Sequence, residues 1–161
     1  MKPTHRLSPA PEFIYTGWQV ADIEKAGLLA VRAGRVLLCR KRRGTRLLIL
    51  PGGRYEAGED GPACLARELS EELGEVRVDG LAYLGTYTDV AASAPGEPSR
   101  TVRIDLFLGE LMGDPAPRSE ILELVWFGES DDAGELAPSL RNSILPDLIG
   151  RGILAWRGFV R

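Results

Sequence analysis

The sequence predicts an α/β fold, a sandwich of helices around a mixed β-sheet. Three observations lead to this expectation: several apolar runs have the length of strands, segments rich in glycine and proline separate them, and two segments have helical patterns. One strong helix among the strands and a second helix near the C-terminus favour a mixed sheet over a repeated strand-helix-strand series.

The chain begins with a segment that resembles no strand or helix. Three prolines stand among polar neighbours in the first dozen residues, which also contain His5, the single histidine of the chain. Such a segment is typical of a flexible tail. We therefore expect a tail over residues 1–12 and a single domain over residues 13–161, since a chain of 161 residues suits one domain better than two.

The next elements are expected to be strands. Two apolar runs, Ala26–Val31 and Arg35–Cys39, flank Ala33-Gly34 and predict a hairpin with a tight turn. After a basic cluster, the run Leu47–Leu50 predicts another strand, which Pro51-Gly52-Gly53 would end abruptly.

A helix is expected from residue 60 to residue 73. Asp60 is a suitable N-cap, Pro62 fits the first turn, and Gly74 stands where the helix must end. Beyond this helix we expect three further strands, at residues 81–88, 102–108 and 122–127, and a second helix at residues 140–149.

The composition limits the classes of partner. A net charge of -3 gives no overall positive field, so we expect no nucleic-acid polymer and no membrane as partner. No apolar run reaches the about 18 to 20 residues of a membrane span, and the start of the chain lacks the apolar core of a signal peptide. Cys39 and Cys64 lie in apolar stretches and are expected to be reduced core thiols. A cytoplasmic protein with a small ligand is the resulting expectation.

The first predicted helix carries a row of carboxylates. Glu68, Glu71 and Glu72 are three and four residues apart and fall within about one third of the helical circumference, beside an apolar stripe of leucines. Like charges at this spacing repel unless a cation lies among their oxygens, and carboxylate oxygens are ligands that Mg²⁺ and Mn²⁺ prefer. When the helix is considered alone, a solvated acidic face, relieved by Arg67, is the favoured explanation.

The residues before the helix make the pattern specific. Five residues separate Gly53 from Glu59, and seven more precede the run Arg67-Glu68-Leu69-Ser70-Glu71-Glu72-Leu73-Gly74. This arrangement resembles the signature of the Nudix hydrolase family, in particular its MutT-like members. The family usually has an aliphatic residue after the last glycine, where this chain has Glu75. That departure concerns local packing rather than metal binding.

The resemblance implies an α/β/α sandwich in which a loop, a helix and a second loop present Mg²⁺ to a diphosphate, with Mn²⁺ as a substitute. Carried over residue by residue, Glu71 and Glu72 would be the main metal ligands. Glu68 would be a further ligand or the general base, and the Gly52 carbonyl would be a backbone ligand.

Other positions of the motif would support this centre. Arg67 would orient the glutamates, and Glu59 would support the loop and helix, although an ordinary charge at a helix N-terminus is an equal explanation for Glu59. Glu120 resembles the family's late glutamate and is a second candidate for a metal ligand and for the base that takes a proton from the attacking water, with Glu123 as its rival.

The substrate implied is a small nucleotide. Arg40, in a basic cluster, is a candidate partner for its phosphates, as are Gly53 and Arg54 in a run that bacterial Nudix proteins share. Asn142 occupies a place similar to the asparagine with which MutT-like members read an oxidised guanine, while a helix cap or a surface amide is the competing explanation. Hydrolysis of a nucleoside triphosphate, including oxidised forms such as 8-oxo-dGTP, is the first expectation.

Two alternatives stay open at this point. The first is hydrolysis of a nucleoside diphosphate linked to another group, such as ADP-ribose or a nucleotide sugar. The second is a Nudix domain that senses a nucleotide without cutting it, which the complete set of motif glutamates disfavours. The family resemblance is also compatible with a homodimer.

Overall fold

The computed structural model of the chain describes residues 20–159. The predicted tail over residues 1–12, with His5, lies outside this range. The predicted division into a tail and a single domain over residues 13–161 therefore stays a prediction.

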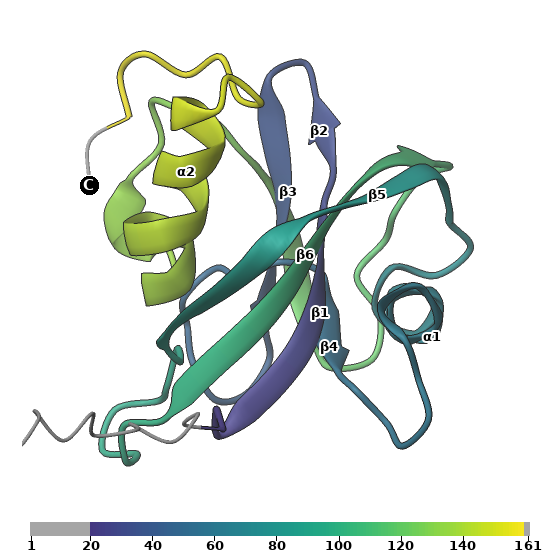
Figure 1. Ribbon diagram of the computed structural model, residues 1–161, viewed down its shortest axis with the longest axis vertical. Coiled ribbons are helices and arrows are strands. Elements are labelled where there is room, and N and C mark those ends of the chain that lie inside the picture. Colours follow the sequence, from purple (N-terminus) through teal and green to yellow (C-terminus); the bar gives the residue numbers. More distant parts are fainter. Residues whose placement is uncertain (1–19, 160–161) are drawn as a thin grey trace, which may run out of the picture.

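A four-stranded mixed sheet forms the centre of the molecule (Figure 1). Its order is β4 (Gly52–Arg54), β1 (Ile23–Leu29), β6 (Thr101–Met112) and β5 (Arg77–Val90). β1 runs parallel to β6 and antiparallel to β4, whereas β5 and β6 form a long antiparallel pair. Because parallel neighbours need a long connection, the whole first helix lies between β1 and β6 in the chain.

A second, antiparallel sheet has the order β2 (Val31–Arg32), β3 (Arg35–Lys41) and β7 (Ile121–Phe127). The predicted tight turn is present, since Ala33 and Gly34 both have positive φ, 48° and 73°. The predicted hairpin is wrong in its extent. Only the two residues of β2 pair with β3, because the run before them belongs to β1 and joins the other sheet.

The strand predicted at Leu47–Leu50 is also wrong. Ile49 makes one isolated bridge to Cys39, and Leu48 makes another to Leu136. These leucines are apolar because they fill the core, and Leu48 and Leu50 are both buried. The regular strand begins at Gly52, where the sequence pattern had placed its end.

The first helix, α1 (Gly61–Leu73), has the predicted boundaries. The Asp60 carboxylate accepts a hydrogen bond of 2.9 Å from the N–H of Ala63, and Gly74 follows the last turn with φ 81°. Leu65, Leu69 and Leu73 face the sheet and are buried.

The C-terminal helical segment has two hydrogen-bonding patterns. A π-helical stretch, η2 (Ser139–Ile144), continues into α2 (Leu145–Gly150), where the prediction had one ordinary helix. Pro146 has no N–H to donate to the previous turn, and the N–H of Leu145 reaches back five residues to the Leu140 carbonyl. The proline therefore accounts for the wider turn. A short 3-10 turn, η1 (Ala133–Glu135), precedes it.

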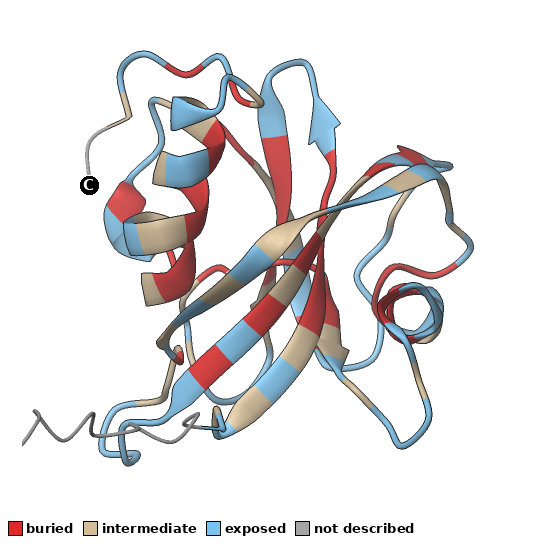
Figure 2. Ribbon diagram, in the orientation of Figure 1, coloured by how far each residue is buried: buried red, intermediate tan, exposed pale blue. Residues whose placement is uncertain are grey.

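Two separate cores hold the layers together, and α1 and α2 lie on opposite sides of the strands (Figures 1 and 2). Leu65, Leu69 and Leu73 of α1 pack with the strands in one core, and Leu145 and Leu148 of α2 pack in the other. This arrangement confirms the predicted α/β/α sandwich with a mixed sheet. Within residues 20–159 no helix is both long and apolar enough to cross a membrane.

Gly61 allows α1 to approach the sheet. A Cβ added at Gly61 would lie 2.3 Å from the Phe107 ring, whereas a Cβ added at Gly150, at the end of α2, would meet nothing within 4 Å. We expect Gly61→Ala to lower the free energy of unfolding by about 1–3 kcal/mol, because the added methyl overpacks a tight contact. Gly150→Ala should be neutral or slightly stabilising. Urea titrations of both variants test this, and an equal effect would contradict it.

Candidate active site

Two glycines bring β4 against α1. A Cβ added at Gly53 would lie 2.3 Å from the Glu68 carboxylate, so Glu68 occupies the space that any other residue at position 53 would fill. Gly52 has φ 129°, and a Cβ there would lie 2.2 Å from the Ala26 carbonyl oxygen of β1. The chain therefore passes between β1 and the glutamates only because both residues lack a side chain.

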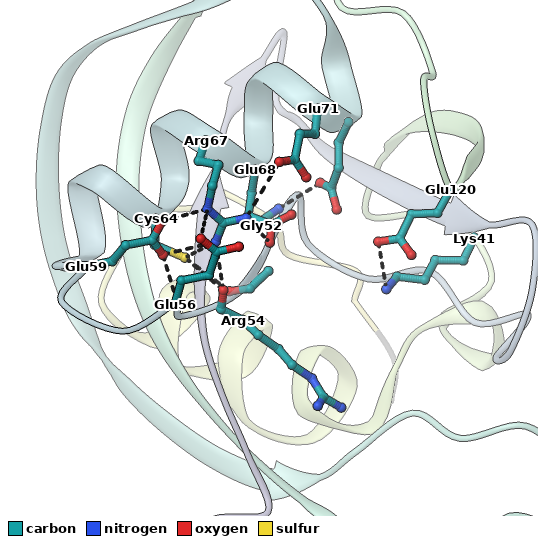
Figure 3. A network of polar contacts seen from close by, with 12 residues as sticks. Lys41, Gly52, Arg54, Glu56, Glu59, Cys64, Arg67, Glu68, Glu71 and Glu120 are labelled. Carbon is teal, nitrogen blue, oxygen red and sulfur yellow. Dashed lines mark hydrogen bonds and ion pairs between the residues drawn. The ribbon is translucent and has the colours of Figure 1, made fainter.

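The Arg67 guanidinium is the centre of the polar network (Figure 3). It donates to both oxygens of Glu59, at 2.6 and 3.0 Å, to Glu68 at 2.9 Å and to the backbone carbonyl of Arg54 at 3.0 Å. Its NH1 also lies 3.8 Å from the carboxylate of Glu71. These bonds lower the pKa of Glu59 to about 2. One side chain thus fixes the loop after β4 and orients two glutamates of the helix.

Glu72 is buried, with 2% of its surface exposed. One carboxylate oxygen accepts a hydrogen bond of 3.0 Å from the N–H of Gly52. Burial raises the pKa of Glu72 to about 7, while the Gly52 N–H and the positive charge of Lys25 act in the opposite direction. A cation beside Glu72 would favour its ionised form.

The three helix glutamates have the chemistry of a divalent-metal site. In the contacts of residues 20–159, each keeps one oxygen that accepts no protein hydrogen bond, because Arg67 or Gly52 contacts only the other oxygen. In the same residues no three acidic, histidine or cysteine side chains already converge on one point. Glu71 is exposed, so its side chain can turn toward an ion without breaking a buried contact. The donor set fits a hard cation such as Mg²⁺.

A pocket of about 460 Å³ opens beside Glu68, whereas Glu71 and Glu72 are not in its lining. Glu68 and Gly53 line one part of it, together with charged side chains from β1, β3 and the loops. The other part is apolar, as expected of a site that holds a partly aromatic ligand. Its apolar walls come from Ile23, Ile49, Leu50, Ala91, Ala92, Val102, Ile104, Ala137 and Leu140.

Glu120 lies at this pocket, on the loop before β7, and its carboxylate is 3.2 Å from the Lys41 ammonium (Figure 3). Its rival Glu123 is not in the pocket lining and forms an ion pair of 2.6 Å with Arg40. The structure thus places Glu120, and not Glu123, beside the same cavity as Glu68.

Three predicted substrate contacts occupy different surroundings. Arg40 is held by Glu123 and by Glu135, at 2.7 Å, and is not in the pocket lining. Arg54 lines the pocket, and its side chain extends away from the glutamates (Figure 3). Asn142 is exposed on η2, outside the lining, and its amide oxygen accepts only a long contact of 3.4 Å from Arg141.

Ser139 and Lys25 are among the pocket residues that the sequence did not predict. Ser139, at the start of η2, is buried with 5% of its surface exposed and lines the pocket. Lys25 lines the pocket from the middle of the sheet. A charged residue among apolar positions on one face of a strand was the available signal for Lys25, since Ile23, Lys25 and Leu29 lie on the same face of β1.

The chain is similar to known proteins in sequence and in fold. The family model of the NUDIX domain matches residues 24–145. No curated protein matches the chain. Among solved structures, a MutT Nudix hydrolase from Burkholderia pseudomallei is 27% identical, with 68% of this chain and 85% of that one covered and a TM-score of 0.57. A MutT protein from Bacillus halodurans is 25% identical, with 71% of this chain and 73% of that one covered and a TM-score of 0.54. A MutT protein from Methanosarcina mazei, 21% identical with coverages of 81% and 94%, shares the fold at a TM-score of 0.64.

The bond between Arg67 and Glu59 predicts a loss of stability in acid. Since the pKa of Glu59 falls from its ordinary 4.5 to about 2 on folding, the unfolded chain takes up the proton first as pH falls. The stabilisation is complete above about pH 4.5 and is lost as pH falls toward 2. Glu59→Gln cannot ionise, so its Tm should change less with pH over this range than that of the unsubstituted protein.

Thermal melts followed by circular dichroism at a series of pH values measure this difference. Glu110→Gln, a change at an exposed position of β6, is the matched control and should keep the pH dependence of the unsubstituted protein. Identical pH profiles for all three proteins would show that the pair adds no acid-sensitive stability.

Proposed function

This chain belongs to the Nudix family and is a hydrolase, and from that premise we propose that it cleaves a phosphoanhydride bond of a nucleoside di- or triphosphate with Mg²⁺. The observation that carries the proposal is the row of glutamates with unshared oxygens, of which Glu68 lines a pocket that also holds lysine side chains. Carboxylates alone would repel a polyphosphate, so the site needs cations between the two.

Several residues of the chain would have separate roles in the proposed reaction. Glu68, Glu71 and Glu72 would hold the ion, with the Gly52 carbonyl as a further ligand, while Arg67 keeps Glu68 in place. When bound, Mg²⁺ withdraws charge from the phosphoryl oxygens and makes a water molecule more acidic. Lys41 would hold Glu120 toward the pocket, at 3.2 Å.

A carboxylate must remove the proton from the attacking water. Glu68 and Glu120 both lie in the pocket lining and are the two candidates. Glu68 is the better enclosed of the two, with 14% of its side chain exposed against 55% for Glu120. Glu68 is also already committed to Arg67 on one oxygen, which leaves its other oxygen for either the ion or the water.

The proposal also covers the class of substrate. The solved relatives from Burkholderia pseudomallei and Bacillus halodurans are named MutT proteins, and we infer a nucleoside triphosphate, including oxidised forms, as the substrate class. Hydrolysis of ADP-ribose or a nucleotide sugar is the second candidate, because a pocket of about 460 Å³ would leave room for a further group beyond the diphosphate. Free, buried Cys39 and Cys64 agree with a reducing compartment such as the cytoplasm.

The first test is dependence on metal and on the helix glutamates. With nucleoside triphosphates, ADP-ribose and nucleotide sugars as substrates, phosphate or pyrophosphate release should require Mg²⁺ and stop in EDTA. Glu71→Gln and Glu72→Gln should each lower kcat/KM about a hundredfold or more, because several kcal/mol of charge stabilisation in the transition state depend on the ion. Glu110→Gln is the control and should retain full activity. Unchanged turnover in both glutamate variants would refute the proposal.

The second test concerns the oxidised base. For Asn142 to read a base, the base must extend past Ser139 and Leu140 to the exposed side of η2. The proposal predicts a higher kcat/KM for 8-oxo-dGTP than for dGTP, and a preference reduced about tenfold or more in Asn142→Ala, since a base contact that is lost costs roughly 1–3 kcal/mol. Steady-state kinetics with both nucleotides measure the ratio. Equal rates for the two nucleotides would remove oxidised guanine from the proposal, and an unchanged preference in Asn142→Ala would remove Asn142.

A further inference from the structure

Lys25 is a positively charged residue of the pocket lining. It lies in the middle of β1, between β4 and β6, where its Cα is paired with Arg54 on one side and Ile104 on the other. Its side chain lines the pocket together with Gly53 and Glu68. The proposed reaction assigns no role to this lysine of the central sheet.

Among residues 20–159, no carboxylate forms an ion pair with the Lys25 ammonium. In the described part of the chain, Glu72 and Glu68 act on it through space and without a hydrogen bond. Burial and the charge of Lys41 lower the pKa of Lys25 from its ordinary value. A partly buried ammonium without a close anion is costly, which indicates that a ligand supplies the missing negative charge.

The other cations of the pocket differ from Lys25 in one respect each. Lys41 is already paired with Glu120 at 3.2 Å. Arg43, Arg54 and Arg100 line the pocket from exposed positions on loops or at a sheet edge. Lys25 therefore combines two properties, a fixed position on a central strand and a free positive charge.

Its position along β1 decides which part of a nucleotide it can reach. Two residues before Lys25, Ile23 is paired with Val102, and both line the apolar part of the pocket. On the other side of Lys25, Gly53 and Glu68 form the part where the ion would bind. Lys25 thus stands at the boundary between the surface suited to a base and sugar and the surface suited to metal and phosphates.

We propose that Lys25 binds the phosphate that is attached directly to the nucleoside, and so fixes how far the phosphate chain extends toward the glutamates. The inference rests on the proposed function, because it takes a nucleotide as the ligand. Lys25 would be a binding and positioning residue rather than the base, since it would contact the substrate at the phosphate nearest the sugar while the ion contacts the phosphates beyond.

A purely structural role makes a different prediction. If Lys25 served as the counterion of buried Glu72, its removal would destabilise the fold and would affect phosphate binding only through that loss. Lys25→Met keeps the length and the apolar stem of the side chain and removes the charge. If the charge is there for a ligand, Lys25→Met should leave the Tm unchanged or raise it, because an unpaired cation no longer has to be desolvated.

The experiment measures the binding of dGMP, dGDP and dGTP in EDTA by NMR titration, which remains usable for weak ligands. Lys25→Met should weaken all three by a similar factor of about 10 to 100, the equivalent of one charge-assisted hydrogen bond to a phosphate. Arg77→Met removes one positive charge at an exposed site outside the pocket and is the matched control. It should leave all three dissociation constants unchanged.

The outcomes separate the two proposals. Weakened binding of dGTP with unchanged binding of dGMP would overturn the assignment, because Lys25 would then contact a distal phosphate. Unchanged binding of all three, a loss of Tm that accounts for the weaker binding, or an unsubstituted protein that binds none of them would overturn it as well. Since EDTA prevents turnover, these results do not depend on hydrolysis, whereas a failure of the proposed function would appear as an absence of metal-dependent product release from every nucleotide.

Discussion

The Arg67 guanidinium is the contact on which the site depends. It binds the end of β4 at the Arg54 carbonyl, the segment before α1 at Glu59, and the glutamate row at Glu68. With 25% of its side chain exposed, it donates hydrogen bonds to carboxylates, and such bonds between charged groups are stronger than those between neutral groups. Because the carboxylates of Glu59 and Glu68 are themselves largely covered, removing the guanidinium would leave two poorly solvated charges rather than merely one lost bond.

The charged groups near the pocket do not fully compensate one another. Buried Glu72 accepts one hydrogen bond from the N–H of Gly52. Lys25 lies nearby and forms no ion pair within the described residues. Neither group neutralises the other by direct contact. The proposed polyphosphate with its cation would supply both missing charges, the positive one for the glutamates and the negative one for the lysine, so binding and charge compensation would occur together.

Local signals in the sequence accounted for the elements that local chemistry controls. Asp60 and Gly74 marked both ends of α1, and Ala33-Gly34 marked the tight turn. The pairing of strands could not be deduced in the same way, because β1 finds its partner β6 about 80 residues away and nothing in an apolar run names its neighbour. Leu47–Leu50 misled for a related reason, since core contacts and strand formation select the same residue types.

The glutamate row was predictable because it lies on one helix at fixed spacing. Lys25, Glu120 and Ser139 come from three distant segments, and only the fold brings them to the same pocket. Gly53 shows a further consequence of that closeness. Its hydrogen fills the place where any larger group would displace the Glu68 carboxylate, so position 53 can accept a larger residue only if position 68 no longer carries that carboxylate. A lineage that lost the acid at position 68 would release position 53 to accept ordinary residues, and a filled position 53 would then be a lasting mark of the abandoned chemistry.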